Sequence, residues 1–421
     1  MSLLTAAFRE QVKKTKDIAQ QSEMTYSTSY STGFLSLDFA NGYVQQINGK
    51  PKFELGFSDG SINMIISDSG LGKTTLTGQM ACNMIRQFPN SAIFYEQAEI
   101  GTNLERIRRL SGFTEEEFER RFIIRDAGIT IESIYERIRM IHDIKVNNKD
   151  DYIYDTGMCD YHGKAIYKFT PTVVIVDSVS MVMSRKNADT DEMTNLSGAQ
   201  QAKANSEYFK KMVPLCRIAN IIMILINHIT TDINTGFLPK KPELPYLKVG
   251  EHLSGSRALV YICNTILRID MKTKLKEGEG FNIIGSVVNV DVVKSRTNKT
   301  SRARCSLVFD QDSGFDPDLS LFLMLKENNL LEGSGAYLKV PGCDTKFSQK
   351  TFKEQLYSDP NLYKAFIITC RDYLKKTLMD EYYKSKVEEE RKSDMRSPYQ
   401  AILDSLYDDN VVTETYDNND E

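Results

Sequence analysis

A glycine-rich segment contains the residues of this sequence that point most directly to chemistry. The segment reads Ser67-Asp68-Ser69-Gly70-Leu71-Gly72-Lys73-Thr74, and Thr75 follows it. Glycines let backbone N–H groups turn towards phosphate oxygens, the lysine reaches the β- and γ-phosphates of a nucleotide, and the hydroxyl after it coordinates magnesium. We therefore expect the residues from Ser69 to Thr75 to bind nucleotide phosphates, with Lys73 at the phosphates and Thr74 at Mg²⁺.

The start of this segment departs from the usual pattern. Ser67 stands where the pattern has its first glycine, whereas Gly72, Lys73 and Thr74 are unchanged. We expect the phosphate-binding end to keep its function, and the effect of Ser67 on the loop stays open.

Two acidic side chains could complete a hydrolytic site. The apolar run 172–177 ends at Asp177, which places a carboxylate at a strand end to hold the magnesium ion. The strand after the glycine-rich segment ends in Tyr95-Glu96-Gln97-Ala98-Glu99. A nucleotide hydrolase needs a group that positions or deprotonates water, and we assign Glu99 to that role. Glu96 is the alternative, because the end of a strand can shift in register by a few residues.

The elements that must position these side chains alternate along residues 61–310. Short runs of β-branched and apolar residues alternate with amphipathic helical patterns, which is typical of a parallel sheet covered by helices on both faces. The predicted strands are 61–67, 91–95, 121–125, 172–177, 221–227, 265–270, 285–294 and 303–309, and the main predicted helices are 73–87, 102–111, 131–145 and 199–219. The sequence therefore predicts an α/β fold with a mostly parallel central sheet.

Composition narrows the class of protein. The 421 residues include 41% apolar side chains and carry a formal charge of -4, which excludes a generally basic nucleic-acid coat. Seven scattered cysteines without a CxxC pair, together with only four histidines, argue against a structural zinc site and indicate a reducing environment. Since no apolar run approaches about 18 residues and no signal peptide is evident, we expect a soluble, cytoplasmic protein without a membrane span.

Four further motifs are short, and their order and spacing carry more weight than any one of them. They are Ser31-Thr32-Gly33-Phe34-Leu35-Ser36-Leu37-Asp38, Ile226-Asn227-His228, Lys294-Ser295-Arg296-Thr297 and the segment from Phe309 to Pro317. The first is similar to the segment before the nucleotide loop of bacterial RecA, and the others resemble later motifs of the phage UvsX-type strand-exchange proteins. The chain thus resembles the RecA-like recombinases, which implies a RecA-like ATPase core over residues 29–330.

This resemblance implies roles for particular side chains. ATP is the implied nucleotide, with Arg106 stacking on its adenine, Glu99 acting in hydrolysis and His228 sensing the nucleotide state. Lys294 and Arg296 are implied to reach the ATP of the adjacent subunit, which would make hydrolysis depend on assembly.

Two polar stretches follow the strands that end at Asp177 and Asn227. The resemblance implies that residues 181–203 and 229–256 are the DNA-binding loops L1 and L2. Basic residues neutralise phosphates, and apolar or aromatic residues wedge or stack bases. Plain disorder is the alternative for such long loops. The basic candidates for DNA contact are Arg185, Lys186, Lys203, Lys240, Lys241 and Lys248.

The ends of the chain and one internal segment depart from the α/β pattern. Residues 1–28 include a helical pattern over 2–22, which packs either on its own core or, as an arm, on the next subunit. Residues 146–171 are polar and tyrosine-rich, and we interpret them as an insertion containing a hairpin. The region 331–403 is mainly helical. Residues 404–421 form an acidic tail that either solubilises the chain or competes with DNA for basic surface.

The sequence thus predicts an ATP- and Mg²⁺-dependent DNA recombinase. The protein is expected to form a homo-oligomeric helical filament on single-stranded DNA, to pair it with double-stranded DNA and to exchange strands. Single-strand-binding and loader proteins are further expected partners, and a phage-encoded chain would act in the host cytoplasm. Two alternatives stay open. One is a hexameric DnaB-like helicase motor, disfavoured because residues 1–30 are too short for its N-terminal domain, and the other is a RecA-fold regulatory ATPase that exchanges no strands.

Overall fold

The computed structural model describes most of the chain. The described residues are 27–48, 50–99, 104–160, 163–185, 198–231, 242–254, 257–276, 283–297, 304–334 and 337–394. The expected helix over 2–22 and the acidic tail 404–421 lie outside them. The chain divides into two compact units, 1–369 and 370–421, and the sheet and the predicted site lie in the first. The domain boundaries expected from the sequence stay a prediction.

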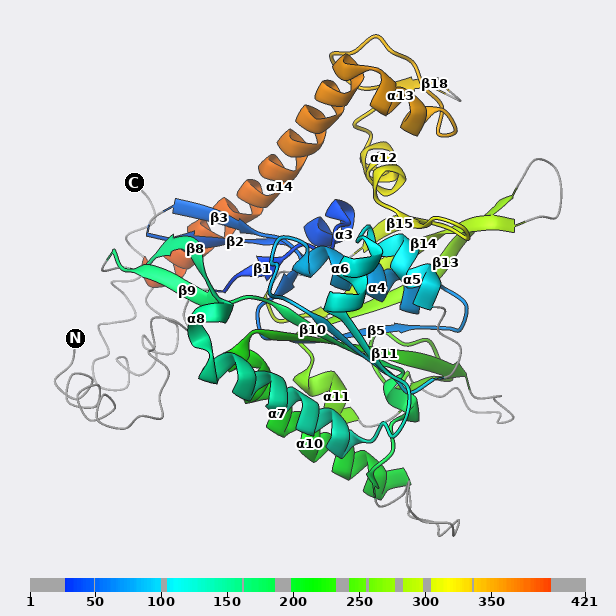
Figure 1. Ribbon diagram of the computed structural model, residues 1–421. Coiled ribbons are helices and arrows are strands. Elements are labelled where there is room, and N and C mark those ends of the chain that lie inside the picture. Colours follow the sequence, from blue (N-terminus) through cyan, green and yellow to red (C-terminus); the bar gives the residue numbers. More distant parts are fainter. Residues whose placement is uncertain are drawn as a thin grey trace, which may run out of the picture. The chain divides into compact units, whose positions relative to one another are not determined.

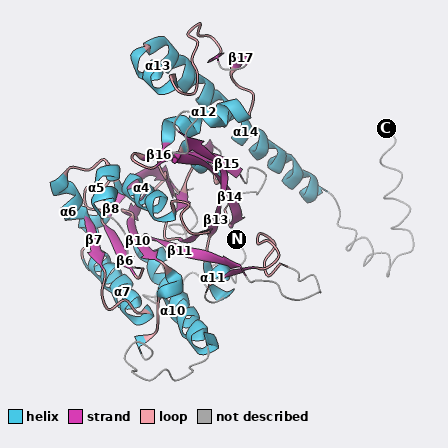
Figure 2. Cartoon of the chain, turned by 90° about the vertical axis from the view of Figure 1, so that its right-hand side faces the viewer, coloured by secondary structure: helices cyan, strands magenta, loops and turns pink. Residues whose placement is uncertain are grey.

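Among the described residues, ten strands form one mixed sheet (Figure 2). They are β5 (Ile62–Ser67), β6 (Ile93–Gln97), β7 (Phe122–Arg125), β10 (Thr172–Asp177), β11 (Ile221–Thr231), β12 (Glu251–Leu253), β13 (Thr265–Lys276), β14 (Ile283–Ser295), β15 (Arg304–Asp310) and β16 (Gly314–Asp316). The order is β16-β15-β14-β13-β5-β11-β10-β6-β7, with β12 beside β11. Neighbours from β13 to β7 are parallel, and β14, β15 and β16 continue the sheet antiparallel. The prediction of an α/β fold with a mostly parallel sheet is confirmed.

Helices cover both faces of this sheet (Figure 1). One face carries α3 (Leu35–Ala40), α4 (Lys73–Ile85), α5 (Leu104–Ser111) and α6 (Glu115–Arg121), and the other carries α7 (Ile131–Asn147), α10 (Gly198–Ala219) and α11 (Arg257–Ile262). Successive strand residues point to opposite faces, so Val173 belongs to the core under α4 and Val174 to the core under α7. Both cores are apolar, which explains why the strands read as nearly continuous apolar runs.

The expected insertion contains a hairpin. It consists of α8 (Lys149–Tyr152), β8 (Ile153–Cys159) and β9 (Ala165–Phe169). Met158 and Ile166 of the hairpin share a small apolar cluster with Ile47 of a second hairpin, made by β2 (Tyr43–Ile47) and β3 (Lys50–Glu54). The short strands β1 (Ser29–Tyr30) and β4 (Phe57–Ser58) pair beside them.

The chain after the sheet forms a smaller aromatic core. Its elements are α12 (Pro317–Glu327), β17 (Glu332–Ser334), β18 (Tyr337–Lys339), α13 (Phe352–Ser358) and α14 (Pro360–Asp394). The one-turn helix η1 (Val179–Met181) is not part of this region, because it directly follows β10. The rings of Phe322, Phe347, Phe352 and Phe366 contact one another, with centroids 5.0 to 6.1 Å apart for the pairs that meet. No helix in the described ranges is long and apolar enough to cross a membrane.

Both expected loops are shorter than the sequence suggested. The helix α10 begins at Gly198, so residues 198–203 are helical rather than part of L1, because Ala, Gln and Lys dominate there and favour a helix. The strand β11 continues to Thr231, because its last residues pair with β12, so 229–231 and 251–253 are strand rather than loop.

Candidate active site

The predicted catalytic side chains gather at one edge of the sheet. The strands β5, β6, β10 and β11 are adjacent and parallel, so their carboxyl ends meet there (Figure 1). Lys73 follows β5, Glu99 follows β6, Asp177 ends β10, and His228 lies in β11 opposite Ser67. Crevices at the carboxyl ends of parallel strands are the usual place for ligands in such sheets.

The glycine-rich loop has an open side that suits phosphate. Gly70 and Gly72 have φ angles of 79° and 80°, a left-handed conformation that favours glycine. A Cβ on Gly72 would lie 2.9 Å from the ring of Phe315, whereas a Cβ on Gly70 would meet no described heavy atom within 4 Å. The helix α4 begins directly after this loop. Because Gly72 has no side chain to cap the first N–H groups of α4, no side chain at that position competes with a phosphate for them. Loop and helix therefore fit a polyphosphate.

Lys73 is buried and engaged with the start of its own loop. Its Nζ donates to the carbonyl oxygens of Ser67 and Asp68 at 3.1 and 2.8 Å, and to the Ser67 hydroxyl at 3.0 Å. Burial lowers the pKa of Lys73, and the nearby acids Asp177 and Glu99 oppose this shift. The ammonium group is thus fixed within reach of the loop that it is predicted to serve.

Asp177 is held by two hydroxyl groups. Thr74 Oγ1 donates to Asp177 Oδ2 at 2.7 Å, and Tyr95 Oη donates to the same oxygen at 2.6 Å. Burial raises the pKa of Asp177, while both hydrogen bonds act to lower it. A hydroxyl and a carboxylate side by side are the hard oxygen ligands that Mg²⁺ prefers beside nucleotide phosphates. These residues therefore fit the predicted ion.

Glu99 lies next to the predicted sensor. His228 Nε2 is 2.9 Å from Glu99 Oε2, and the N–H groups of Ala98 and Glu99 donate to the carbonyl oxygen of Asp177 at 2.7 and 2.9 Å. The alternative, Glu96, is fully buried and forms ion pairs with Arg125 and Arg137. Of the two acids, Glu99 is the one placed at the sheet edge with Asp177.

Arg106 forms a planar pair with an aromatic ring that the sequence reading did not single out as a site residue. Its guanidinium lies 5.7 Å from the ring centre of Phe309, which in turn contacts Phe315 against the glycine-rich loop. A flat cation and a flat ring can hold an adenine between or beside them. The only sequence signal for Phe309 was its place in the motif that runs from Phe309 to Pro317.

Lys294 and Arg296 do not join this cluster within the chain. Lys294 Nζ donates to the carbonyl oxygens of Val260 and Tyr261 at 2.5 and 3.2 Å, and Arg296 donates to the same Tyr261 oxygen. Both cations therefore lie at the C-terminal end of α11, where helix carbonyls attract positive charge. The ring of Tyr261 beside them is exposed.

The predicted DNA-contacting residues have separate positions. Arg185 pairs with Glu136 at 3.0 Å, and Lys248 lies 3.4 Å from Asp270 and 3.8 Å from Glu251. Lys203 lies in α10, and Lys186, Lys240 and Lys241 lie outside the described residues. Arg185 and Lys248 thus carry charges that acidic neighbours partly offset.

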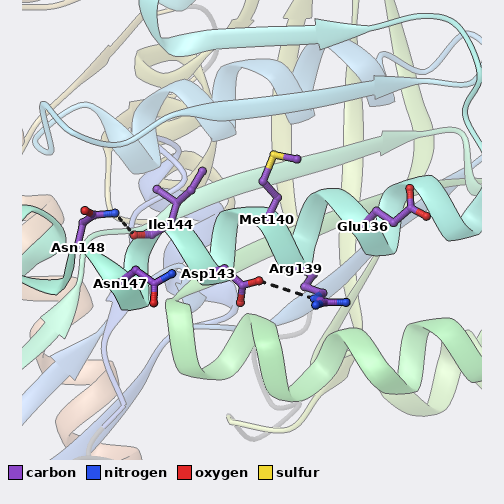
Figure 3. A pocket seen from close by; sticks show the side chains of 7 residues that line it. All are labelled: Glu136, Arg139, Met140, Asp143, Ile144, Asn147 and Asn148. Atoms are coloured by element: carbon purple, nitrogen blue, oxygen red, sulfur yellow. Dashed lines mark hydrogen bonds and ion pairs between the residues drawn. The ribbon is translucent and has the colours of Figure 1, made fainter.

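A shallow hollow of about 460 Å³ lies on the outer surface of α7 (Figure 3). Its lining comes from α7 and the residue after it, with Met140 and Ile144 as the apolar members and Arg139 facing Asp143. None of the predicted site residues lines it, so it is separate from the sheet edge described above.

One family model matches the part of the chain that contains the strands with Asp177, His228 and Lys294. The RecA N-terminal domain family matches residues 164–312. Over these residues the chain is similar to the RecA family. The chain is also 25% identical over 253 residues to a mitochondrial DNA repair protein recA homolog of Dictyostelium discoideum, covering 59% of the chain and 51% of that relative. It is 25% identical over 203 residues to Protein RecA of Pseudomonas savastanoi pv. phaseolicola, covering 48% and 53%.

The RecA-like chain spans about half the length of these curated relatives. Among solved structures, a crystal structure of the RadB recombinase covers 62% of the chain and 92% of its own length, with 18% identity and a TM-score of 0.36.

Proposed function

We propose that this RecA-like chain is a DNA-dependent ATPase that forms filaments on single-stranded DNA and catalyses homologous pairing and strand exchange. The observation that carries the proposal is the gathering of Lys73, Thr74, Asp177, Glu99 and His228 at one sheet edge. These are a phosphate-binding lysine, two oxygen ligands, a candidate base and a polar sensor, which are the parts that phosphoryl transfer to water requires.

Each of these side chains has a task in hydrolysis. Mg²⁺ held by these residues would supply positive charge that offsets the charge of the nucleotide phosphates. Lys73 donates to the same phosphates, and Thr74 and Asp177 present the oxygens that hold the ion. Glu99 accepts the hydrogen bond of the attacking water, and His228, which contacts Glu99 in this structure, reports the state of the γ-phosphate through β11 to the segment that follows.

Lys294 and Arg296 act on a second copy of the chain in this proposal. They sit together at the end of α11 and outside the cluster of their own subunit, which suits side chains that approach a neighbour's phosphates. Charge supplied from outside the subunit stabilises the transition state only after assembly. The exposed Tyr261 lies on the same surface.

The DNA contacts belong to the segments after β10 and β11. Met181 and Met183 begin the first segment with 54% and 48% of their surface exposed, which leaves apolar side chains available to bases. Arg185 and Lys248 supply charge for phosphates. Single-stranded DNA, a homologous duplex and further copies of the chain are the main partners, and single-strand-binding and loader proteins are further ones. In its most specific form, the proposal is that the chain is a UvsX-type phage protein that acts in the host cytoplasm.

Strand exchange between a labelled single strand and a homologous duplex tests the proposal directly. We expect joint molecules with ATP and Mg²⁺, none with a heterologous duplex, and none with Lys73→Ala. Unwinding of a forked duplex without any need for homology would identify a helicase motor instead. ATP hydrolysis without either reaction would identify a regulatory ATPase.

A further inference from the structure

Ser67 lies at a position where its hydroxyl group can act on the nucleotide loop. It is the last residue of β5, it is fully buried, and it is paired in register with His228 of β11. Its Oγ donates to the carbonyl oxygen of Asp68 at 2.7 Å and accepts from Lys73 Nζ at 3.0 Å. A glycine at this position, as in the usual pattern, would offer only its backbone.

The three contacts of Lys73 use all of its hydrogen-bonding capacity. An ammonium group has three N–H donors, and the three acceptors here are Ser67 O, Ser67 Oγ and Asp68 O. Lys73 can therefore donate to a phosphate oxygen only after it gives up one of them. Hydrogen bonds that involve a charged donor are strong, so the loss of one from Lys73 to the loop weakens the net binding of the nucleotide.

The Ser67 hydroxyl adds one acceptor to the two backbone carbonyl oxygens that hold Lys73. Ser67 Oγ and the Asp68 carbonyl oxygen are also hydrogen-bonded to each other, so both keep a partner when Lys73 turns to a phosphate oxygen. Without the serine hydroxyl, one N–H group of Lys73 would have no competing acceptor in the loop.

We propose that Ser67 is a positioning residue of the nucleotide site: its hydroxyl holds Lys73 at the start of the loop, competes with the phosphates for it, and so weakens the binding of nucleotides that carry a β-phosphate. This inference rests on the proposed function, because it requires Lys73 to bind phosphates. Ser67 thereby sets the nucleotide concentration at which the protein is loaded.

The test is nucleotide affinity of the full chain, measured by calorimetry in the presence of Mg²⁺ for ATP, ADP and AMP. We expect Ser67→Ala to bind ATP and ADP about three- to tenfold more tightly, since it lacks the competing acceptor. AMP should bind the variant and the unaltered chain equally, because it lacks the β- and γ-phosphates that Lys73 reaches. Ser67→Gly should show the same pattern, which keeps the test valid where alanine disturbs folding.

Ser61→Ala is the matched control. Ser61 immediately precedes β5 at its other end, is buried, and donates its hydroxyl to Ser58 O at 2.6 Å without contacting Lys73. This variant should lose some thermal stability and keep its affinity for ADP. In a Lys73→Met background, Ser67→Ala should no longer alter ADP binding.

The outcomes separate the inference from the proposed function. Unchanged or weaker ADP binding by both Ser67 variants would overturn the role of Ser67 while leaving the nucleotide site intact. Equal tightening for AMP would also overturn it, because a change in loop shape rather than Lys73 would then be responsible. Failure of the unaltered chain to bind ATP or ADP would overturn the proposed function itself.

Discussion

Tyr95 fixes the carboxylate that is predicted to hold magnesium. It is fully buried in β6, and its hydroxyl donates to the same Asp177 oxygen that accepts from Thr74. Groups that orient a metal ligand commonly change metal affinity by one or two orders of magnitude when they are removed. In the proposed mechanism, Tyr95 therefore affects hydrolysis through Asp177.

We expect Tyr95→Phe to raise the Mg²⁺ concentration for half-maximal ATP hydrolysis by about tenfold. Binding of ADP in the presence of a chelator should stay unchanged, since the phosphate contacts of Lys73 do not involve Tyr95. Tyr167→Phe, which alters an exposed tyrosine in the hairpin, is the control. An unaltered Mg²⁺ requirement in Tyr95→Phe would contradict the role given to this hydroxyl.

Lys145 near the end of α7 makes stability depend on pH. It is buried, with Nζ donating to Thr170 O at 2.6 Å and to Thr172 Oγ1 at 3.0 Å, and burial lowers its pKa to about 7. In an unfolded chain lysine titrates near 10.4, so between about pH 7 and pH 10 the unfolded state binds more protons than the folded state. The contribution of Lys145 to the free energy of unfolding therefore becomes more favourable as the pH rises across that window and less favourable as the pH falls.

Lys145→Met should remove this pH-dependent contribution. Relative to the unaltered chain, the variant should be most favoured at and below pH 7, and the difference should shrink towards pH 10. Denaturant unfolding at several pH values measures it, and Lys149→Met, at an exposed lysine nearby, is the control. A constant difference between Lys145→Met and the unaltered chain at all pH values would exclude this explanation.

Among single residues, the sequence predicts those that belong to a recognisable motif and misses those whose role depends on a neighbouring strand or helix. Lys73 and Thr74 follow from their motif, and Asp177 from its place at a strand end. Tyr95 reads as one more apolar residue of a strand, and its role becomes visible only when β6 and β10 lie side by side. The neighbours of Lys294 likewise depend on where α11 ends in space.

Arg268 ties the segment after β11 to the strand beside the nucleotide loop. It is buried in β13, next to β5, and its guanidinium donates to both Glu251 oxygens, both Asp270 oxygens and the Tyr246 carbonyl oxygen at 2.7 to 3.0 Å. Glu251 also accepts from the backbone N–H of Lys248 at 2.6 Å. One buried cation thus organises residues 242–254.

We expect Arg268→Ala to lower the free energy of unfolding by about 3 kcal/mol, because the buried carboxylate of Glu251 and the half-buried carboxylate of Asp270 lose their shared cation. Limited proteolysis should cut residues 242–254 faster in this variant. Arg304→Ala removes the ion pair between the exposed Arg304 and the half-buried Asp291 in the same sheet and should cost about 1 kcal/mol or less. Equal losses in the two variants would contradict the organising role of Arg268.

Element types were predictable because both sheet faces are covered, which leaves long apolar runs in the sequence. Strand ends were less predictable. The strand β6 continues through Glu96 although the apolar pattern stops before it, because Arg125 and Arg137 neutralise that buried carboxylate. The strand β13 continues to Lys276 through polar residues, because β14 pairs with it along its length.

At the level of the whole molecule, we propose that hydrolysis needs two subunits. Glu99→Gln should inactivate a subunit's own site, and a double variant of Lys294→Ala and Arg296→Ala should fail to complete its neighbour's site. Mixing the two inactive proteins on DNA should restore part of the hydrolysis, because some interfaces then combine an intact Glu99 with intact cations. No recovery on mixing, with filaments present, would place the two cations outside the neighbour's site.

The most direct test of the account is the ATPase rate with and without single-stranded DNA, with the same samples imaged by negative-stain microscopy. We expect DNA to stimulate hydrolysis, helical filaments to form with ATP, and Lys73→Ala to abolish hydrolysis. Closed rings in place of filaments would contradict the recombinase and favour a helicase motor. Hydrolysis that does not respond to DNA would contradict a DNA-dependent function altogether.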